Sequence, residues 1–342
     1  MAIRLKDIAR DLGISTVTVS KVLRGNQDIS EKTRALVLKR MQELNYKPNM
    51  LARGLASGRT FTVGLVVPDL VHTFFAEFAK SLAGTLRGSQ MALLLASSEE
   101  NPELEQQEIR TLLGRNVDVL LIVSCQTRLK NFYELGDERT PFLLVDRNFP
   151  YLSAHFVGSD DYEISRIATE HLITIERKRI AHIGGRALSP STERLRGYRD
   201  TLHHHQMESP EEHIISLERV EELGDEAGYH AMNQLLKLPD RPDAVFCYND
   251  LTAIGAMEAV RVAGLRVPED VAFVGAGNLR YAKYLRVPLT SVDQHPETLG
   301  LRAGELALEV MAHPEMPFRT LLLPPRLVVR ESSGGAGLRA EL

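Results

Sequence analysis

Residues 3–60 read IRLKDIARDLGISTVTVSKVLRGNQDISEKTRALVLKRMQELNYKPNMLARGLASGRT, and this stretch decides the fold of the N-terminal part of the chain. Four apolar residues recur there at helical spacing and predict a first short helix: Leu5, Ile8, Ala9 and Leu12. Gly13 should end this helix, because glycine adopts a left-handed turn without steric cost. Ser15 can then cap a second helix, Thr16–Leu23, by accepting a hydrogen bond from a free backbone amide.

The second predicted helix should have a buried and an exposed side. Three apolar residues are expected to face the core: Val19, Val22 and Leu23. Five residues are expected to face solvent: Thr16, Val17, Thr18, Ser20 and Lys21. Short polar and methyl-bearing side chains near a helix N-terminus suit entry into the major groove, because they reach phosphates and base edges while the backbone approaches closely. The stretch therefore predicts a helix-turn-helix that reads double-stranded DNA.

A third helix is expected from Ser30 to about Leu44, with an apolar side formed by Ala35, Val37, Leu38, Met41 and Leu44. Pro48 should break it, and Asn49 can cap a further short helix over Met50–Ser57. That helix is too short to be stable alone, and Gly54 destabilises it by roughly 1 kcal/mol relative to alanine. We expect it to fold only against DNA and a partner copy.

The runs DIARDLGISTVTVSKVLRG and LNYKPNMLARGLASGRT closely resemble the lactose-repressor/galactose-repressor (LacI/GalR) family of bacterial transcription regulators, and the likeness spans nearly the whole chain. The resemblance implies that Thr16, Val17 and Lys21 read bases. It implies phosphate contacts at four further positions: Ser15, Thr18, Ser20 and Asn26. In the hinge, Asn49 and Arg53 are also expected at the DNA, and Leu55 matches the leucine that wedges into the minor groove. The alternative is a helical oligomerisation hairpin that binds no nucleic acid.

Charge is unevenly distributed along the chain. Residues 1–60 contain 12 lysines and arginines against 5 aspartates and glutamates, the remaining residues contain 29 against 40, and the whole chain has a formal net charge of −4. A basic head on an acidic body concentrates the attraction for phosphates at the head. The distribution, unlike the total, favours nucleic acid as a partner.

Other features argue against several classes of protein. Cys125 and Cys247, the only cysteines, each end an apolar run, the usual setting of a small buried thiol. The charged N-terminus lacks the apolar core of a signal peptide and no apolar stretch could span a bilayer, so we expect a cytoplasmic protein. His203, His204 and His205 follow one another on a predicted helix and point in different directions. We expect no metal, no cofactor and no enzymatic activity.

From Phe61 onward, apolar runs alternate with amphipathic segments. The expected strands are Val63–Pro68, Met91–Ser97, Val119–Ser124, Phe142–Asp146, Ile180–Gly184, Ala244–Tyr248 and Val271–Gly275. The expected helices are Phe74–Arg87, Glu103–Arg115, Tyr162–Thr174, Thr192–Gln206, Ala227–Leu236 and Leu251–Ala263. Near-continuous apolar strands alternating with helices predict parallel sheets covered on both faces, and the length allows two such units.

The predicted domain plan has four parts. Residues 1–47 form an all-α helix-turn-helix domain, and residues 48–60 form a hinge helix or linker. Residues 61–331 form an α/β domain of two lobes, about 61–160 plus 288–318 and 161–287 plus 319–331. The resemblance identifies it as a type I periplasmic-binding-protein-like domain for effector binding and dimerisation. The glycine-containing tail, residues 332–342, is expected to be disordered, and it lacks the leucine heptads of a tetramerisation helix.

Ligands bind open parallel sheets at the carboxyl ends of the strands. By resemblance, seven residues there match the family's effector cleft: Phe74, Phe75, Asp146, Arg147, Arg194, Asn249 and Gln294. This set suits a sugar or another polar metabolite. Each member also has a structural alternative, since the phenylalanines can be core, Arg194 can cap a helix or pair with Asp160, and Asn249 can cap the helix that follows it.

The cleft departs from the family pattern at one strand end. Gly275-Ala276-Gly277 replaces the usual Gly-aromatic-Asp triplet, so Gly277 stands where an aspartate commonly holds the effector's hydroxyls. The alternatives to a sugar of the usual kind are a differently shaped ligand, an anion held by Arg147, Arg194 and Arg280, or no ligand.

Parts of the sequence are also compatible with three other functions. The Gly275–Gly277 triplet resembles the start of a dinucleotide fingerprint, but Arg280 replaces the third glycine, which disfavours a dehydrogenase. A solute-binding receptor would share the lobes but not the basic head. A DNA-binding regulator controlled by a protein partner is the third. We predict a transcriptional regulator, a repressor rather than an activator, that binds a pseudo-palindromic operator as a homodimer and responds to a sugar-like effector in the interlobe cleft.

Overall fold

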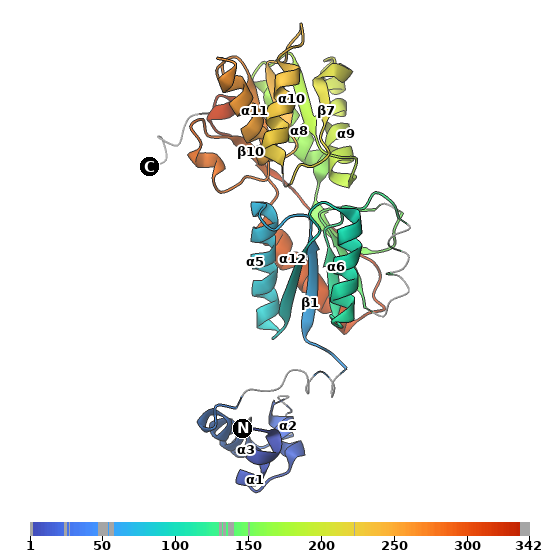
Figure 1. The fold of residues 1–342 in the computed structure, drawn as a ribbon, viewed down its shortest axis with the longest axis vertical. Helices are drawn as coiled ribbons and strands as arrows, with labels where there is room; N and C mark the ends of the chain where they lie inside the picture. The colour runs from blue at the N-terminus through green and yellow to red at the C-terminus, as the bar shows by residue number, and fades with distance from the viewer. Residues whose placement is uncertain are drawn as a thin grey trace. The chain divides into compact units, whose positions relative to one another are not determined.

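The computed structural model divides the chain into two compact units, Met1–Thr60 and Phe61–Leu342 (Figure 1). It describes residues 3–23, 26, 28–46, 54, 58–129, 132, 135, 140–149, 151–221 and 223–335. Apart from Gly54, the predicted hinge helix lies outside the described residues, and so do residues 336–342 of the predicted tail. Within the described ranges, no helix combines the length and the apolar character needed to cross a membrane.

The described part of the first unit forms three helices: α1 (Leu5–Asp11), α2 (Thr16–Leu23) and α3 (Glu31–Glu43). Gly13 follows α1 with a φ of +62°, the left-handed conformation predicted for it. The Ser15 hydroxyl accepts a hydrogen bond from the Thr18 amide at 3.0 Å, which caps α2 as expected. The two turn signals in the sequence therefore have the predicted geometry.

The core of this unit draws on all three helices. Its buried apolar residues are Ile8, Ala9, Val19, Val22, Val37 and Met41. The predicted apolar side of α3 is wrong at two positions, because Ala35 is exposed and Leu38 is 49% exposed. Three short helices enclose a small core, and it reaches only the strip of α3 that carries Val37 and Met41, one turn apart.

The first lobe of the second unit contains a six-stranded parallel sheet in the order β11-β5-β4-β3-β1-β2. The strands are β1 (Thr62–Val67), β2 (Ala92–Ser97), β3 (Val119–Ile122), β4 (Phe142–Val145), β5 (His155–Ser159) and β11 (Thr320–Leu323). Helices α5 (Thr73–Gly88) and α12 (Pro296–Ala312) cover one face, and α6 (Pro102–Gly114) covers the other (Figure 1). Central strands such as β1 and β3 are buried on both faces, which explains why they read as continuous apolar runs.

The second lobe repeats this plan, with the sheet order β12-β10-β9-β8-β6-β7. The strands are β6 (Ile180–Gly184), β7 (Ile214–Ser216), β8 (Ala244–Cys247), β9 (Ala272–Ala276), β10 (Thr290–Asp293) and β12 (Arg326–Val328), of which β12 runs antiparallel to β10. Helices α10 (Gly224–Leu235) and α11 (Asp250–Val262) cover one face. Helices α8 (Asp161–Thr174) and α9 (Ser189–His204) cover the other.

The chain passes between the lobes after β5, after β10 and after β11. The last two passages differ from the predicted lobe division. Strand β10 pairs with β9 in the second sheet, although residues 288–318 were assigned to the first lobe. Strand β11 pairs with β5 in the first sheet, although residues 319–331 were assigned to the second. Backbone pairing with a neighbouring strand decides which sheet a strand joins. The sequence of a short apolar strand is compatible with both sheets, so it does not identify that neighbour.

The first residues of the predicted tail pack against the second lobe. Ser332 and Ser333 are buried in a 3₁₀ turn, Glu331–Ser333. The Ser332 hydroxyl donates to the Phe273 carbonyl at 2.7 Å and accepts from the Thr290 amide at 2.8 Å. The expectation of disorder is therefore wrong for residues 332–335, because small hydroxyl side chains here satisfy buried backbone groups of the second sheet.

Candidate functional site

Helix α2 exposes two of the three residues predicted to read bases, Thr16 and Val17. Val17 is 60% exposed, Thr16 and Ser15 are also exposed, and Val19 and Val22 are buried against the other two helices. Thr18, Ser20, Lys21 and Leu23 are half-buried. The apolar Val17 side chain therefore lies open to solvent beside two hydroxyl groups, and this surface matches the methyl and edge contacts that a major groove offers.

Lys21 has a partner within the head. Its ammonium donates a hydrogen bond to the Asp28 carboxylate, and this bond lowers the pKa of Asp28. The Lys21 and Asp28 side chains are 39% and 53% exposed, and an ion pair so accessible to solvent stabilises a protein little. Asn26 is exposed, and its carbonyl accepts a hydrogen bond from Arg34 at 2.5 Å. The remaining predicted DNA contacts, Asn49, Arg53 and Leu55, lie outside the described residues.

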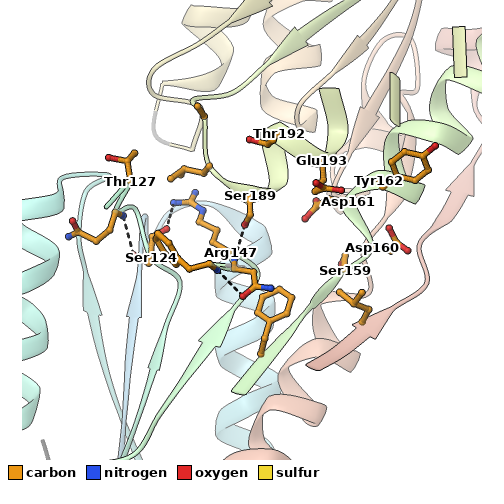
Figure 2. A pocket seen from close by; sticks show the side chains of 17 residues that line it. Ser124, Thr127, Arg147, Ser159, Asp160, Asp161, Tyr162, Ser189, Thr192 and Glu193 are labelled. Carbon is orange, nitrogen blue, oxygen red and sulfur yellow. Dashed lines mark hydrogen bonds between the residues drawn. The ribbon is translucent and has the colours of Figure 1, made fainter. Parts of the chain in front are cut away.

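The second unit has a cleft between its lobes, with a cavity of about 450 Å³. Both lobes contribute polar groups to its wall: Ser124, Gln126, Thr127, Arg147, Asn148, Ser159, Asp160, Asp161, Ser189, Thr192 and Glu193. Figure 2 shows Arg147 between the Ser124 segment of the first lobe and Ser189 of the second. The Asn148 amide donates to the Ser189 hydroxyl at 2.7 Å, so the lobes contact each other directly here.

Arg147 lies at the centre of the cleft and is 1% exposed. Its guanidinium donates to the Ser124 carbonyl at 3.3 Å and to the Glu221 carboxylate of the second lobe at 2.7 Å. Burial lowers the pKa of Arg147, but the surrounding carboxylates, Glu221 foremost, outweigh burial and raise it. Glu105, fully buried on α6, accepts from the Ser124 hydroxyl at 2.7 Å and so fixes the loop that receives Arg147.

Asp146 precedes Arg147 in a strained backbone conformation. Its φ of +61° lies in the left-handed region, which few residues other than glycine adopt. Burial raises the pKa of its carboxyl group, while Arg147 and Arg194 lower it. Nε of Arg147 lies 3.9 Å from the Asp146 carboxylate, which is longer than a hydrogen bond. Asp146 and Arg147, both predicted effector residues, thus have their charged groups close to each other without a hydrogen bond between them.

Arg194 of α9 is engaged within the second lobe. Its Nε and Nη2 lie 2.9 and 2.8 Å from one oxygen of Asp161, its Nη1 donates to the Tyr248 carbonyl, and its guanidinium lies 4.6 Å from the centre of the Tyr248 ring. Burial raises the pKa of Asp161 to about 7, and Arg194 opposes this rise. The partner is therefore Asp161, not Asp160, and Asp161 itself lines the cavity.

The remaining predicted effector residues have structural contacts. Phe74 and Phe75 belong to the first-lobe core and form an edge-to-face pair with centroids 5.2 Å apart. Asn249 accepts from the Thr252 amide at 2.9 Å and donates to the Val220 carbonyl at 2.9 Å. Gln294 is buried, and its carbonyl accepts from Ser159 at 3.3 Å. Of the seven, only Arg147 is among the residues that line the described cavity.

Gly277 stands where the resemblance places an aspartate, and the neighbouring carboxylate of Asp250 has other partners. This residue has a φ of +123°, which would strain any L side chain. Asp250 lies next to it but is fully buried, and its oxygens accept from the Ser291 hydroxyl and the Leu279 amide. The Asn278 side chain binds Arg330 at 2.6 Å and Asp293 at 3.2 Å. Arg280, offered as an anion ligand, is exposed and does not line the cavity.

Several cleft residues were missed in the sequence. The strand-end rule could have identified Ser124, which follows β3, and Ser159, which ends β5. Pro190 at the start of α9 was a signal that this helix begins before Thr192, which would have placed Ser189 at the cleft. Glu221 had no local signal, because it lies in a loop after the short strand β7. The described residues contain no group of side chains suited to hold a metal ion.

Two family models match this chain. Residues 4–49 match the model described as bacterial regulatory proteins, lacI family. Residues 169–333 match that of a periplasmic binding protein-like domain. The predicted fold, a helix-turn-helix domain followed by a two-lobed α/β domain, is therefore confirmed.

The chain is also similar to named proteins over nearly its whole length. It is 32% identical to the ribose operon repressor of Haemophilus influenzae, over 96% of this chain and 98% of that protein. It is likewise 32% identical to the HTH-type transcriptional regulator GalR of Salmonella typhimurium, over 96% and 95%. A solved complex of the transcriptional regulator CelR with cellobiose is 30% identical, with a TM-score of 0.73 over 96% of this chain and 99% of that one. The lac repressor dimer bound to operator and the anti-inducer ONPF, 23% identical, shares the fold with a TM-score of 0.85 over 97% and 99%.

Proposed function

Because the chain belongs to the lacI family of bacterial regulatory proteins, we propose that it represses transcription as a homodimer bound to a pseudo-palindromic operator. A small polar effector in the interlobe cleft controls this binding. The observation that carries the proposal is the exposed side of α2, where Thr16 and Val17 face solvent on a basic head. Relatives named as transcriptional regulators support it.

The chemistry of the cleft supports an uncharged polyol as the effector. The cavity of about 450 Å³ is of the size that binds small metabolites. Serine, threonine and amide groups in its wall suit hydroxyl groups, as in a sugar. An anionic effector loses support, because Arg147 and Arg194 already have the carboxylates of Glu221 and Asp161 as partners. The names of two relatives, the ribose operon repressor and the CelR–cellobiose complex, point the same way.

Exposed apolar residues support association of two copies. On the first lobe, Val71 is 88% exposed, Leu70 47% and Leu95 43%, around a shallow groove between α5 and the edge strand β2. On the second lobe, Tyr281 is 63% and Tyr284 71% exposed. Clustered apolar side chains on a surface mark an interaction site, and a two-fold axis would pair each patch with its own copy.

The proposal is tested by selecting duplexes from a random library with the full-length protein. The expected product is a two-fold symmetric site whose half-sites are one helical turn apart or a multiple of it. Leu55→Ala should then lower affinity for that site by a few kcal/mol and spare random duplex, because a minor-groove wedge acts only where DNA kinks. Absence of any preferred duplex at low ionic strength would overturn the assignment. A thermal-shift series of aldoses, disaccharides, sugar acids and sugar phosphates tests the effector.

A further inference from the structure

A loop of the second lobe reaches across the cleft at Glu221. The loop follows β7, and Asn249 holds it through the Val220 carbonyl at 2.9 Å. Val220 and Glu221 are 3% and 5% exposed. The Glu221 amide donates to the Glu100 carboxylate of the first lobe at 3.2 Å. The backbone at Glu221 is therefore fixed from both lobes.

The Glu221 carboxylate contacts two residues of the first lobe. One oxygen lies 2.7 Å from Arg147, and the other lies 3.4 Å from Nε2 of His72. The three side chains are only 1% to 5% exposed. Arg147 belongs to the loop after β4 and His72 caps α5, so both first-lobe elements are joined to the second lobe by one side chain.

This arrangement connects the two lobes through a buried ion pair. Removing one partner while the lobes stay together would leave the other charge buried and unpaired, which is strongly destabilising. When the lobes separate, the Arg147–Glu221 pair must break and both charges must regain water. The Glu221 carboxylate binds Arg147 as the carboxylate of a separate ligand would, but it is part of the protein chain.

We propose that Glu221 is a built-in ligand of the cleft, which holds the two lobes closed in the absence of effector. This inference rests on the proposed function in one respect, that the cleft is the effector site. If Glu221 closes the lobes, an effector does not need a negative charge of its own to pair with Arg147. A compound that takes the place of the Glu221 carboxylate at Nη2 of Arg147 thereby releases the contact between the lobes.

The proposal is tested by hydrogen exchange on the effector-free, full-length protein. The Asn148 amide donates to Ser189 of the other lobe, so its exchange rate reports closure through a contact that Glu221 itself does not make. Glu221→Ala should raise exchange of the segment containing Asn148 by about tenfold, the factor that corresponds to about 1.4 kcal/mol. Peptides from β1 in the core should exchange as in the parent. Glu218→Ala, an exposed carboxylate in the same loop, is the matched control and should leave both rates unchanged.

A second variant separates this role from damage caused by a stranded charge. Arg147→Gln combined with Glu221→Gln removes both charges together, so neither is left buried alone. Faster exchange at Asn148 in this double variant, with the core unchanged, supports the proposal. Exchange at Asn148 equal to that of the parent in both variants overturns it. The readout involves neither DNA nor effector, so a failure here is distinct from a failure of operator binding.

Discussion

Lys21 pairs with Asp28 in the free protein, and it is predicted to contact DNA instead when the head is bound. The side chain is half-buried and bound to Asp28, an acidic residue at the edge of the predicted DNA-binding surface. A phosphate or base can replace Asp28 at low energetic cost, because exposed ion pairs of this kind contribute about 0–1 kcal/mol. If the head binds DNA as proposed, exchanging Asp28 for DNA as the partner of Lys21 therefore costs the head little stability.

Lys21→Ala should relax base preference at particular operator positions, with a loss of about 1–3 kcal/mol at the selected site. The measurement is a competition assay against operators substituted one base pair at a time. Lys39→Ala, an exposed lysine on α3, is the control and should keep the parental preference. If the Lys21 variant retains the parental preference at every position, Lys21 is not a base-reading residue.

His182 links the stability of the second lobe to pH. It is 1% exposed and stacks between Tyr198 and Phe246, with centroids 5.3 and 5.0 Å away. Burial lowers its pKa from 6.5 to about 4. Between these values the unfolded chain binds a proton that the folded chain does not. The contribution of His182 to the free energy of unfolding is therefore fully present above pH 6.5, and it is lost as the pH decreases toward 4.

His182→Phe should remove this contribution, which amounts to about 1.4 kcal/mol per pH unit over that interval. Urea titrations of the parent and the variant at several pH values give the two slopes of unfolding free energy. His204→Phe, at an exposed position near the end of α9, should leave the parental slope intact. Equal slopes in parent and His182→Phe would show that the folded protein protonates this ring.

At the scale of elements, two glycines allow α12 to pack closely against α5. A Cβ atom at Gly300 would lie 2.4 Å from the Phe78 carbonyl oxygen, and one at Gly304 would lie 2.9 Å from Thr85 side-chain atoms. The first contact is with backbone, which cannot rotate away. The close approach joins a helix from the end of the chain to one from the start of the same lobe.

Gly300→Ala should therefore force the two helices apart and destabilise the first lobe by about 1–3 kcal/mol, as overpacking usually does. Gly114→Ala is the matched control, because it lies at the end of α6 with no atom within 4 Å of the added Cβ. The control should be neutral or slightly stabilising. Denaturant midpoints of both variants measure the difference, and a stable Gly300→Ala protein would contradict the tight packing.

At the scale of the whole molecule, association should depend on the apolar patch of the first lobe. Val71→Asp places a charge where the side chain is 88% exposed in the single chain and buried in the proposed dimer. Sedimentation velocity at micromolar concentration should then show monomers, and affinity for a two-fold operator should fall. Tyr151→Asp changes a side chain that is 90% exposed elsewhere on the chain, and it should remain dimeric. A dimeric Val71→Asp protein would place the interface on another surface.

Much of the architecture could be predicted because it depends on local pattern. Gly13 and Ser15 mark their turns through backbone freedom and hydroxyl capping, which neighbouring residues alone determine. The alternation of apolar runs and helices predicted two parallel sheets for the same reason. The errors fall where distant contacts decide. Strands β10 and β11 were assigned to the wrong lobes, and Ser332 was placed in a disordered tail, because their partners lie far away in the sequence.

The candidate site, like the fold, has parts that the sequence predicted and parts that depend on distant contacts. The sequence by itself determined the head, the two-lobed body and the presence of Arg147 and Asp146 at a strand end, since each follows from short-range pattern or family likeness. Only the tertiary structure decided which charges meet. It paired Arg194 with Asp161, brought Glu221 of one lobe to Arg147 of the other, and gave Gly277 a backbone conformation that disfavours a side chain. Electrostatic pairing in a buried cleft depends on distances of a few ångströms between segments far apart in the chain, and the linear order of residues does not contain those distances.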